Sequence, residues 1–127
     1  MNATMADVMQ ACPITVNMED SIDKVEAVLL DHNLNSVPVI DPARGDCFGV
    51  ISLKDISRFH ATNFNAKTTQ AWEICSYKPV EVSSTTSVSD AARLMVGKSI
   101  HHLVVADDNS VQGFVSSLDV IRSYLRK

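Results

Sequence analysis

Hydrophobic and polar residues follow the same order twice along this chain. In each copy, a proline is followed by a short run in which hydrophobic and polar residues alternate as in a β-strand. An amphipathic stretch with apolar residues three and four positions apart comes next. Two further apolar runs and a second amphipathic stretch complete each copy. The pattern predicts the order β-α-β-β-α in each copy, with strands at 14–16, 36–40, 48–52, 80–82, 103–106 and 112–116.

The predicted helices begin at polar residues that suit helix starts. Ser21 precedes the first amphipathic stretch, and Ser87 with Asp90 three residues later has the spacing of a capping box. The segment 61–70 is rich in Thr, Asn and Lys and carries no apolar stripe. We therefore interpret it as a linker between the two copies.

The closest similarity between the copies is a short motif. Gly49–Asp55 reads Gly-Val-Ile-Ser-Leu-Lys-Asp, and Gly113–Asp119 reads Gly-Phe-Val-Ser-Ser-Leu-Asp. In both, a glycine and an apolar strand lead into Ser-x-x-Asp at the start of a predicted helix. Such a repeat indicates a duplicated supersecondary unit, in which each copy buries part of its apolar face against the other. Two equivalent polar corners predict two equivalent sites.

Composition and charge narrow the class of protein. The 127 residues are 46% hydrophobic and 20% charged, which is typical of one compact domain. No apolar run approaches the ~20 residues of a membrane span, and the first residues lack the features of a signal peptide. We therefore expect a cytoplasmic protein that does not bind a membrane. The net charge of −4 argues against a nucleic-acid surface, which needs a dense set of Lys and Arg.

The three cysteines give no sign of a structural cross-link. Cys12, Cys47 and Cys75 are odd in number and far apart, and none belongs to a Cys-x-x-Cys pair. This spacing favours neither a disulfide framework nor a zinc site. We predict free thiols and no bound metal.

The order of the predicted elements and three sequence features together resemble the cystathionine-β-synthase (CBS) domain. These features are Ser-Val-Pro-Val-Ile-Asp at 36–41, its counterpart at 100–107, and the two Gly-apolar-x-Ser-x-x-Asp segments. Two such domains in tandem resemble a Bateman module, and the resemblance covers nearly the whole chain. It implies an α/β (α+β) fold in which the two units pack through their sheets about a pseudo-twofold axis. The implied division is a first unit at 1–60, a linker at 61–70 and a second unit at 71–127.

The resemblance also implies a class of ligand and the residues that bind it. Members of this family hold adenosine-containing ligands, such as AMP, ADP, ATP, S-adenosylmethionine or NAD, in the clefts between the two units. We expect AMP, ADP or ATP as a regulatory ligand and no required cofactor. The residues expected to bind it are Cys12, Pro13, Ile14, Gly49, Ser52, Asp55, Arg58, Lys78, Pro79, Val80, His101, His102, Gly113, Ser116, Asp119 and Arg122.

Elementary chemistry gives the corner residues their expected roles. A serine at a helix start lies where free N–H groups and the helix dipole favour anions, so Ser52 and Ser116 are predicted to face phosphate. The carboxylates of Asp55 and Asp119 only accept hydrogen bonds, which suits a ribose diol. A glycine before the strand lets another group approach the backbone closely.

Further residues are expected to complete the pockets. As the resemblance implies, Ile14 and Val80 cover the adenine, and the residues next to them shape the walls. Arg58 and Arg122 each follow a motif aspartate by three residues and are candidates to bind phosphate. At the second-strand position, related modules place His or Arg against the phosphate.

The two pockets are not expected to bind phosphorylated ligands with equal affinity. His101 and His102 hold that second-strand position in the second copy, whereas Asn35 and Ser36 hold it in the first. Since the units cross, the two histidines are predicted to reach the pocket built on Asp55. We therefore expect phosphorylated ligands to prefer that pocket.

Simpler interpretations stay open. Ser-x-x-Asp is also a capping box that serves the helix alone, and Arg58 and Arg122 can pair with the aspartates three residues before them. No activated nucleophile or phosphate-binding loop is found, so catalysis is not expected. The alternatives are a ligand-free dimerisation or interaction module, or a sensor of S-adenosylmethionine or NAD.

Our hypothesis from the sequence is a stand-alone regulatory module for energy sensing and signal transduction. It binds an adenosine nucleotide between its two units and signals to an unidentified partner protein in trans. By the tendency of the family it resembles, it forms a homodimer.

Overall fold

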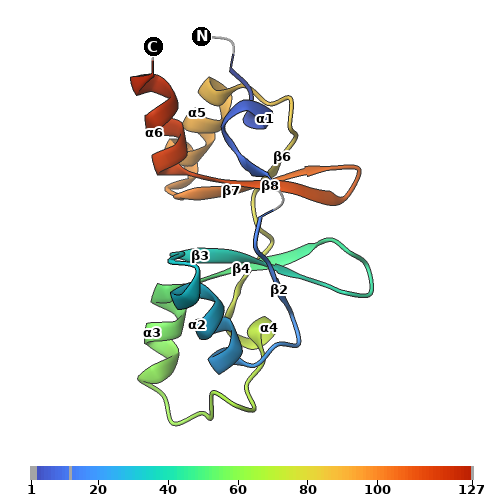
Figure 1. Cartoon of the computed structure of the whole chain (residues 1–127), viewed down its shortest axis with the longest axis vertical. Coiled ribbons are helices and arrows are strands. Elements are labelled where there is room, and N and C mark those ends of the chain that lie inside the picture. The colour runs from blue at the N-terminus through green and yellow to red at the C-terminus, as the bar shows by residue number, and fades with distance from the viewer. Residues whose placement is uncertain (1–2, 12, 127) are drawn as a thin grey trace. The chain divides into compact units, whose positions relative to one another are not determined.

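The structure, a computed structural model, describes residues 3–11 and 13–126 (Figure 1). The chain forms two compact units. One unit consists of Ile14–Pro79, and we name it the central unit. The other combines Met1–Pro13 with Val80–Lys127, and we name it the terminal unit because both chain ends belong to it.

The central unit is a four-stranded sheet with its helices on one face (Figure 1). The strand order is β2-β3-β4-β5; β2 runs parallel to β3, and the other neighbours are antiparallel. Its elements in chain order are β2 (Val16–Asn17), α2 (Ile22–Asp31), β3 (Ser36–Ile40), β4 (Cys47–Ser52), α3 (Leu53–His60), α4 (Ala71–Ile74) and β5 (Ser76–Tyr77).

The terminal unit has the same architecture. Its strand order is β1-β8-β7-β6, with β6 parallel to β7 and the other neighbours antiparallel. All three of its helices lie on one face of this sheet (Figure 1). Its elements in chain order are α1 (Met5–Val8), β1 (Gln10–Ala11), β6 (Glu81–Val82), α5 (Val88–Lys98), β7 (His102–Asp107), β8 (Ser110–Ser116) and α6 (Ser117–Leu125).

The short helix and strand that precede each repeat belong to the unit of the other repeat. Strand β1 pairs with β8, and β5 pairs with β4. Equivalent backbone hydrogen bonds hold the adjoining helices. The Met5 N–H donates to the Thr86 carbonyl at 2.8 Å, and the Ala71 N–H donates to the Asp20 carbonyl at 2.8 Å. The two repeats thus exchange equivalent segments.

This exchange makes the compact units differ from the linear division expected from the sequence. That division places 1–60 in one unit and 71–127 in the other, whereas residues before Ile14 pack with the second repeat and residues up to Pro79 pack with the first. The physical reason is that an open sheet edge leaves N–H and C=O groups unpaired. The exchanged strands satisfy part of these edges.

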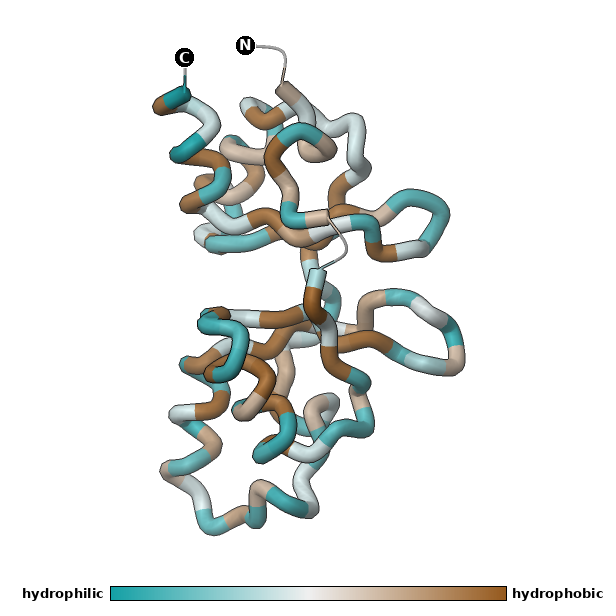
Figure 2. The backbone as a smooth tube through the Cα atoms, viewed as in Figure 1, coloured by the Kyte–Doolittle hydropathy of each residue, from teal (hydrophilic) through white to brown (hydrophobic). Residues whose placement is uncertain are grey.

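Each unit has a core between its sheet and its helices. In the central unit, the alternating strand residues Val37 and Val39 pack with buried side chains of α2 and α3. In the terminal unit, Leu103 and Val105 pack with buried side chains of α5 and α6. Figure 2 shows hydrophobic residues along the strands, whereas the 61–70 segment is mainly hydrophilic or intermediate. The fully buried core residues include Ile22, Val25, Leu29, Ile51, Met5, Ala91 and Val115.

The predicted order β-α-β-β-α is confirmed in both repeats, and β3 has the predicted bounds. The first strand of each repeat is shorter than predicted and begins at Val16 or Glu81, because the residues before it lie where the chain passes between the units. The predicted capping box at Ser87 is only half formed. The Ser87 Oγ accepts from the Asp90 N–H at 3.1 Å, but the Asp90 carboxylate binds Arg93 instead.

Candidate functional site

The corner at the start of α3 is built from Ser52 and Asp55. The Ser52 Oγ accepts a hydrogen bond from the Asp55 N–H at 3.2 Å. In return, the Asp55 Oδ2 accepts from the Ser52 N–H at 2.9 Å and from the Ser52 hydroxyl at 3.0 Å. These contacts form a complete capping box, so the serine hydroxyl and one carboxylate oxygen already serve the helix. The Oδ1 oxygen of Asp55 has no hydrogen-bond donor among residues 3–11 and 13–126.

Ser116 and Asp119 repeat this geometry at the start of α6. The three hydrogen bonds have the same lengths, 3.2, 2.9 and 3.0 Å. The corners differ in the arginine that follows. The Arg122 Nη1 lies 3.7 Å from the Asp119 Oδ1, whereas Arg58 forms no ion pair or hydrogen bond with any residue that the structure describes. The simple pairing of arginine with aspartate is therefore present only in the terminal unit.

The glycine of each motif allows a protein segment to approach its strand. A β-carbon on Gly49 would overlap the Ser76 carbonyl oxygen and lie 2.9 Å from the Cys75 Sγ. A β-carbon on Gly113 would overlap the Met9 side chain. The predicted close approach is thus made by the exchanged segments. Their packing explains why both motifs contain glycine without invoking a ligand.

The two histidines lie beside the corner of their own unit. His102 is directly opposite Ser116 in the β7–β8 pairing, and its ring centroid lies 5.3 Å from that of Phe114. The His101 carbonyl accepts from the Ser117 N–H at 2.7 Å, and the His101 side chain is exposed. In the central unit, the Asn35 carbonyl makes the equivalent bond to Leu53 at the start of α3. The expected reach of the histidines to the Asp55 pocket stays a prediction.

The residues expected to form the pocket walls lie where the chain passes between the units. Pro13 belongs to the terminal unit and Ile14 to the central unit; Pro79 and Val80 mark the second passage. Val80 packs against the core of the terminal unit, and its carbonyl accepts from the backbone of β7. Ile14 is 37% exposed. The other two residues of this set are Lys78, which is exposed with a positive φ of 52°, and Cys12, which lies outside the described residues.

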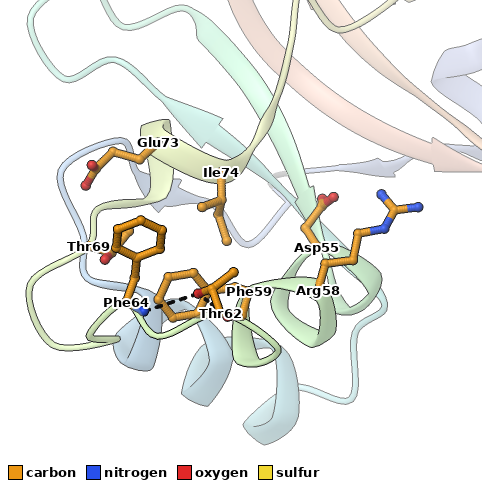
Figure 3. A pocket seen from close by; sticks show the side chains of 8 residues that line it. All are labelled: Asp55, Arg58, Phe59, Thr62, Phe64, Thr69, Glu73 and Ile74. Carbon is orange, nitrogen blue, oxygen red and sulfur yellow. Dashed lines mark hydrogen bonds between the residues drawn. The ribbon is translucent and has the colours of Figure 1, made fainter.

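A pocket of about 490 Å³ opens next to the Asp55 corner, entirely within the central unit (Figure 3). Asp55 and Arg58 line one end of it. The prediction from sequence missed its other residues, because they lie in the 61–70 segment or in the exchanged helix α4, or were assigned to the core. These residues are Phe59, Thr62, Phe64, Thr69, Glu73 and Ile74.

The thiol nearest this corner is held in its neutral form. Burial, and then the negative charge of Asp55, raise the pKa of Cys75 from an ordinary value of 9.0 to about 11. Cys75 is 7% exposed and is a free thiol. The described part of the chain contains no cluster of three or more His, Cys, Asp or Glu side chains suited to a metal ion. It also contains no helix that is long and apolar enough to cross a membrane.

Comparisons with known proteins agree on the family. The family model described as "CBS domain" matches twice, at residues 5–61 and 71–126. The chain is 25% identical to "CBS domain-containing protein YhcV" of Bacillus subtilis (strain 168) over 118 residues, which is 93% of this chain and 83% of that protein. Several other curated relatives are longer, and the chain spans less than half of their length.

Solved structures show the same fold. The CBS domain pair of protein MJ0100, in complex with 5-methylthioadenosine and S-adenosyl-L-methionine, has a TM-score of 0.88 and 27% identity, with 99% of this chain and 98% of that chain covered. CBSX2 in complex with AMP has a TM-score of 0.82 and 23% identity, with 98% and 97% covered. The family model matches two repeats, and each repeat has the order β-α-β-β-α. With the shared fold, these matches show that the chain belongs to the CBS domain family, as a tandem pair.

Proposed function

We propose that this protein is a regulatory module that binds an adenosine-containing ligand at its Asp55 and Asp119 corners and signals the bound state to a partner protein. One observation carries the proposal. In the described chain, Asp55 keeps an oxygen without a donor, and Arg58 one turn later keeps its guanidinium without an acceptor. The carboxylate can accept from a ribose diol, and the guanidinium can bind a phosphate.

The relatives support this class of ligand. Two tandem pairs of the same fold are solved with adenosine-containing molecules, one with AMP and one with 5-methylthioadenosine and S-adenosyl-L-methionine. The free Arg58 favours a phosphate-bearing ligand, so we propose the AMP, ADP or ATP class. S-adenosylmethionine is the second candidate, because the pair solved with it is 27% identical to this chain.

The Asp55 corner is proposed as the preferred site. Its twin holds the Arg122 guanidinium 3.7 Å from the Asp119 carboxylate, so a ligand there must compete with an existing, though long and exposed, ion pair. The proposed contact of His101 and His102 with the ligand's phosphate also favours binding at the Asp55 corner.

The proposed mechanism is a population shift. A ligand changes the equilibrium between two conformations only by the difference between its affinities for them. A ligand that contacts both repeats favours one arrangement of the repeats, and a partner protein that recognises this arrangement is switched. No step of this mechanism requires a catalytic residue.

The test is the thermal midpoint of the purified protein with AMP, ADP, ATP, NAD and S-adenosylmethionine, each well above its dissociation constant. At 100 times that constant a ligand adds about 2.7 kcal/mol to the free energy of unfolding, which raises the midpoint by several degrees. We expect a shift with a phosphorylated adenosine, lost in Asp55→Ala and retained in Asp119→Ala. No shift with any of these ligands would favour the ligand-free interaction module.

A matched control separates ligand binding from helix capping. Asp55→Ala removes a capping box and lowers the midpoint even without ligand. Asp7 forms the same contacts at the start of α1, where its Oδ2 accepts from the Thr4 N–H at 2.9 Å and from the Thr4 hydroxyl at 3.2 Å. Asp7→Ala should therefore lower the midpoint but leave the ligand-induced shift intact.

We also propose that the protein forms a homodimer and that the helical face of the terminal unit is the dimer interface. A groove of about 410 Å³ lies between α5 and α6, and Ala92, Val96 and Tyr124 are among the residues that line it. Val96 is 81% exposed. In the central unit, Glu26 and His60 hold the positions of Ala92 and Tyr124, and their side chains form an ion pair at 2.9 Å when His60 is protonated. One face is therefore apolar and suited to a second copy, whereas its twin is polar.

A further inference from the structure

Part of the pocket beside α3 is formed by residues that lie outside the two ranges matched by the family model. The matched ranges end at residue 61 and resume at residue 71. Thr62, Phe64 and Thr69 lie between these ranges, yet they form one wall of the pocket. We name it the linker pocket. Its shape therefore depends on a segment that this chain does not share with the family model.

The linker segment is fixed at both ends. The Thr62 hydroxyl donates to the Phe59 carbonyl at 2.6 Å, and the Phe64 N–H donates to the Thr62 hydroxyl at 3.3 Å (Figure 3). At the other end, the Thr69 carbonyl accepts from the Ile22 N–H at the start of α2. A wall held in this way keeps the pocket open in the absence of a ligand.

Away from Asp55 and Arg58, the linker pocket has an apolar floor, and Thr69 and Glu73 also line that end (Figure 3). Phe59 is 5% exposed and forms the floor with the half-buried Ile74, and both belong to or pack against the central core. Phe64 is 74% exposed although it is aromatic, and it lines the same pocket (Figure 3). In the other repeat, Ser123 holds the position of Phe59 and its hydroxyl donates to the Val120 carbonyl. The terminal unit therefore does not build the same apolar floor.

The other end carries two opposite charges that do not neutralise each other. Asp55 and Arg58 are three residues apart on α3 and line the pocket together, yet they form no ion pair with each other or with other residues of the described chain. Figure 3 shows both side chains at the end of the pocket opposite Phe64, with Phe59 and Ile74 between. A ligand with an anion and a cationic donor close together, followed by an apolar group, complements this arrangement.

We propose that the linker pocket binds a free α-amino acid with an apolar side chain, an alternative occupant that competes with the proposed adenosine ligand for Asp55 and Arg58. Its carboxylate binds the Arg58 guanidinium, and its ammonium group donates to the open Oδ1 of Asp55. Its side chain lies over Phe59 and Ile74 and against Phe64. A volume of about 490 Å³ is within the usual range for a small-molecule site.

The test compares L-phenylalanine with two molecules that each lack one charge. 3-Phenylpropanoate keeps the ring and the carboxylate, and 2-phenylethylamine keeps the ring and the ammonium group. Calorimetric or NMR titration should show binding of L-phenylalanine and L-leucine, with each truncated molecule weaker by about tenfold or more. Equal binding of either truncated molecule, or no binding of L-phenylalanine or L-leucine, would overturn the proposal.

A pair of variants assigns the site and separates this proposal from the adenosine proposal. Phe64→Ala removes an exposed wall residue and should weaken L-phenylalanine binding about tenfold while leaving adenosine-ligand binding unchanged. Leu30→Ala removes another exposed apolar side chain of the same unit, 63% exposed on α2, and should change neither. If Phe64→Ala instead abolishes adenosine binding and spares L-phenylalanine, the pocket belongs to the nucleotide and the amino-acid assignment is wrong.

Discussion

The backbone of Ser76 lies so close to Gly49 that a β-carbon at position 49 would overlap the Ser76 carbonyl oxygen. A backbone oxygen in a paired strand cannot move aside cheaply. Gly49→Ala should therefore lower the free energy of unfolding by about 3 kcal/mol, at the upper end of overpacking effects. Gly113→Ala meets the flexible Met9 side chain instead and should cost about 1 kcal/mol. Denaturant unfolding of both variants measures the difference.

Gly97 supplies the control for this pair. It lies in α5, and a β-carbon there would meet no atom within 4 Å. Gly97→Ala should raise the free energy of unfolding by about 0.5 to 1 kcal/mol, since alanine has the higher helix propensity. A loss of stability in Gly97→Ala, or equal losses in Gly49→Ala and Gly113→Ala, would contradict this account of the motif glycines.

Two serines that both begin helices should differ in their contribution to stability. The Ser52 hydroxyl accepts from the backbone N–H of Asp55, whereas the Ser21 hydroxyl makes no capping bond and donates to Asp23. Ser52→Ala should therefore cost about 1 kcal/mol and Ser21→Ala less than about 0.5 kcal/mol. Thermal midpoints lowered by several degrees in the first variant only would agree with this. Equal midpoints would show that the capping bond at Ser52 does not stabilise α3.

The stability of the protein should fall between pH 9 and pH 11 because of Cys75. Its pKa in the folded protein is about 11, against an ordinary value of 9.0, so the unfolded chain loses this proton first as the pH rises. The stabilisation is complete below pH 9 and disappears as the pH passes 11; two pKa units correspond to about 2 to 3 kcal/mol.

Unfolding free energies at pH 8 and pH 11 measure this effect. Other groups titrate in the same range, so the informative quantity is the difference between the wild-type protein and Cys75→Ala. The pH-dependent loss should be smaller in the variant by about 2 to 3 kcal/mol. Parallel pH curves for the two proteins would show that the Cys75 thiol is not held neutral by its surroundings.

Sequence periodicity predicted the repeated elements that have a hydrophobic stripe or alternation of their own. The strand at 36–40 is such a case, since Val37 and Val39 alternate toward the core. The four-residue helices α1 and α4 and the two-residue strands β1 and β5 are too short to show a period. Their exchange between the repeats depends on packing against Gly49 and Gly113, which are distant in sequence.

The candidate site was only partly predictable for the same reason. Ser52, Asp55 and Arg58 follow one another along one helix start, so a local motif identifies them. The linker pocket combines this helix with Phe64 and with Ile74 of α4. A polar segment with one phenylalanine has the composition of a linker, and only the folded chain shows that this ring faces a pocket. Sequence therefore identified the charged end of the pocket and not its apolar end.

The proposed dimer leads to the last prediction, because the two helical faces form a natural comparison. On α6, Ile121 is 52% exposed, whereas the equivalent position on α3 is the exposed Ser57. A charge buried in an apolar interface is costly. Ile121→Glu should therefore raise the dimer dissociation constant by about a hundredfold, and Ser57→Glu should leave it unchanged. Sedimentation velocity over a range of protein concentrations measures both, with circular dichroism to confirm that each variant is folded. A monomeric wild-type protein, or a dimer disrupted by Ser57→Glu and not by Ile121→Glu, would show that the apolar face of the terminal unit is not the site of self-association.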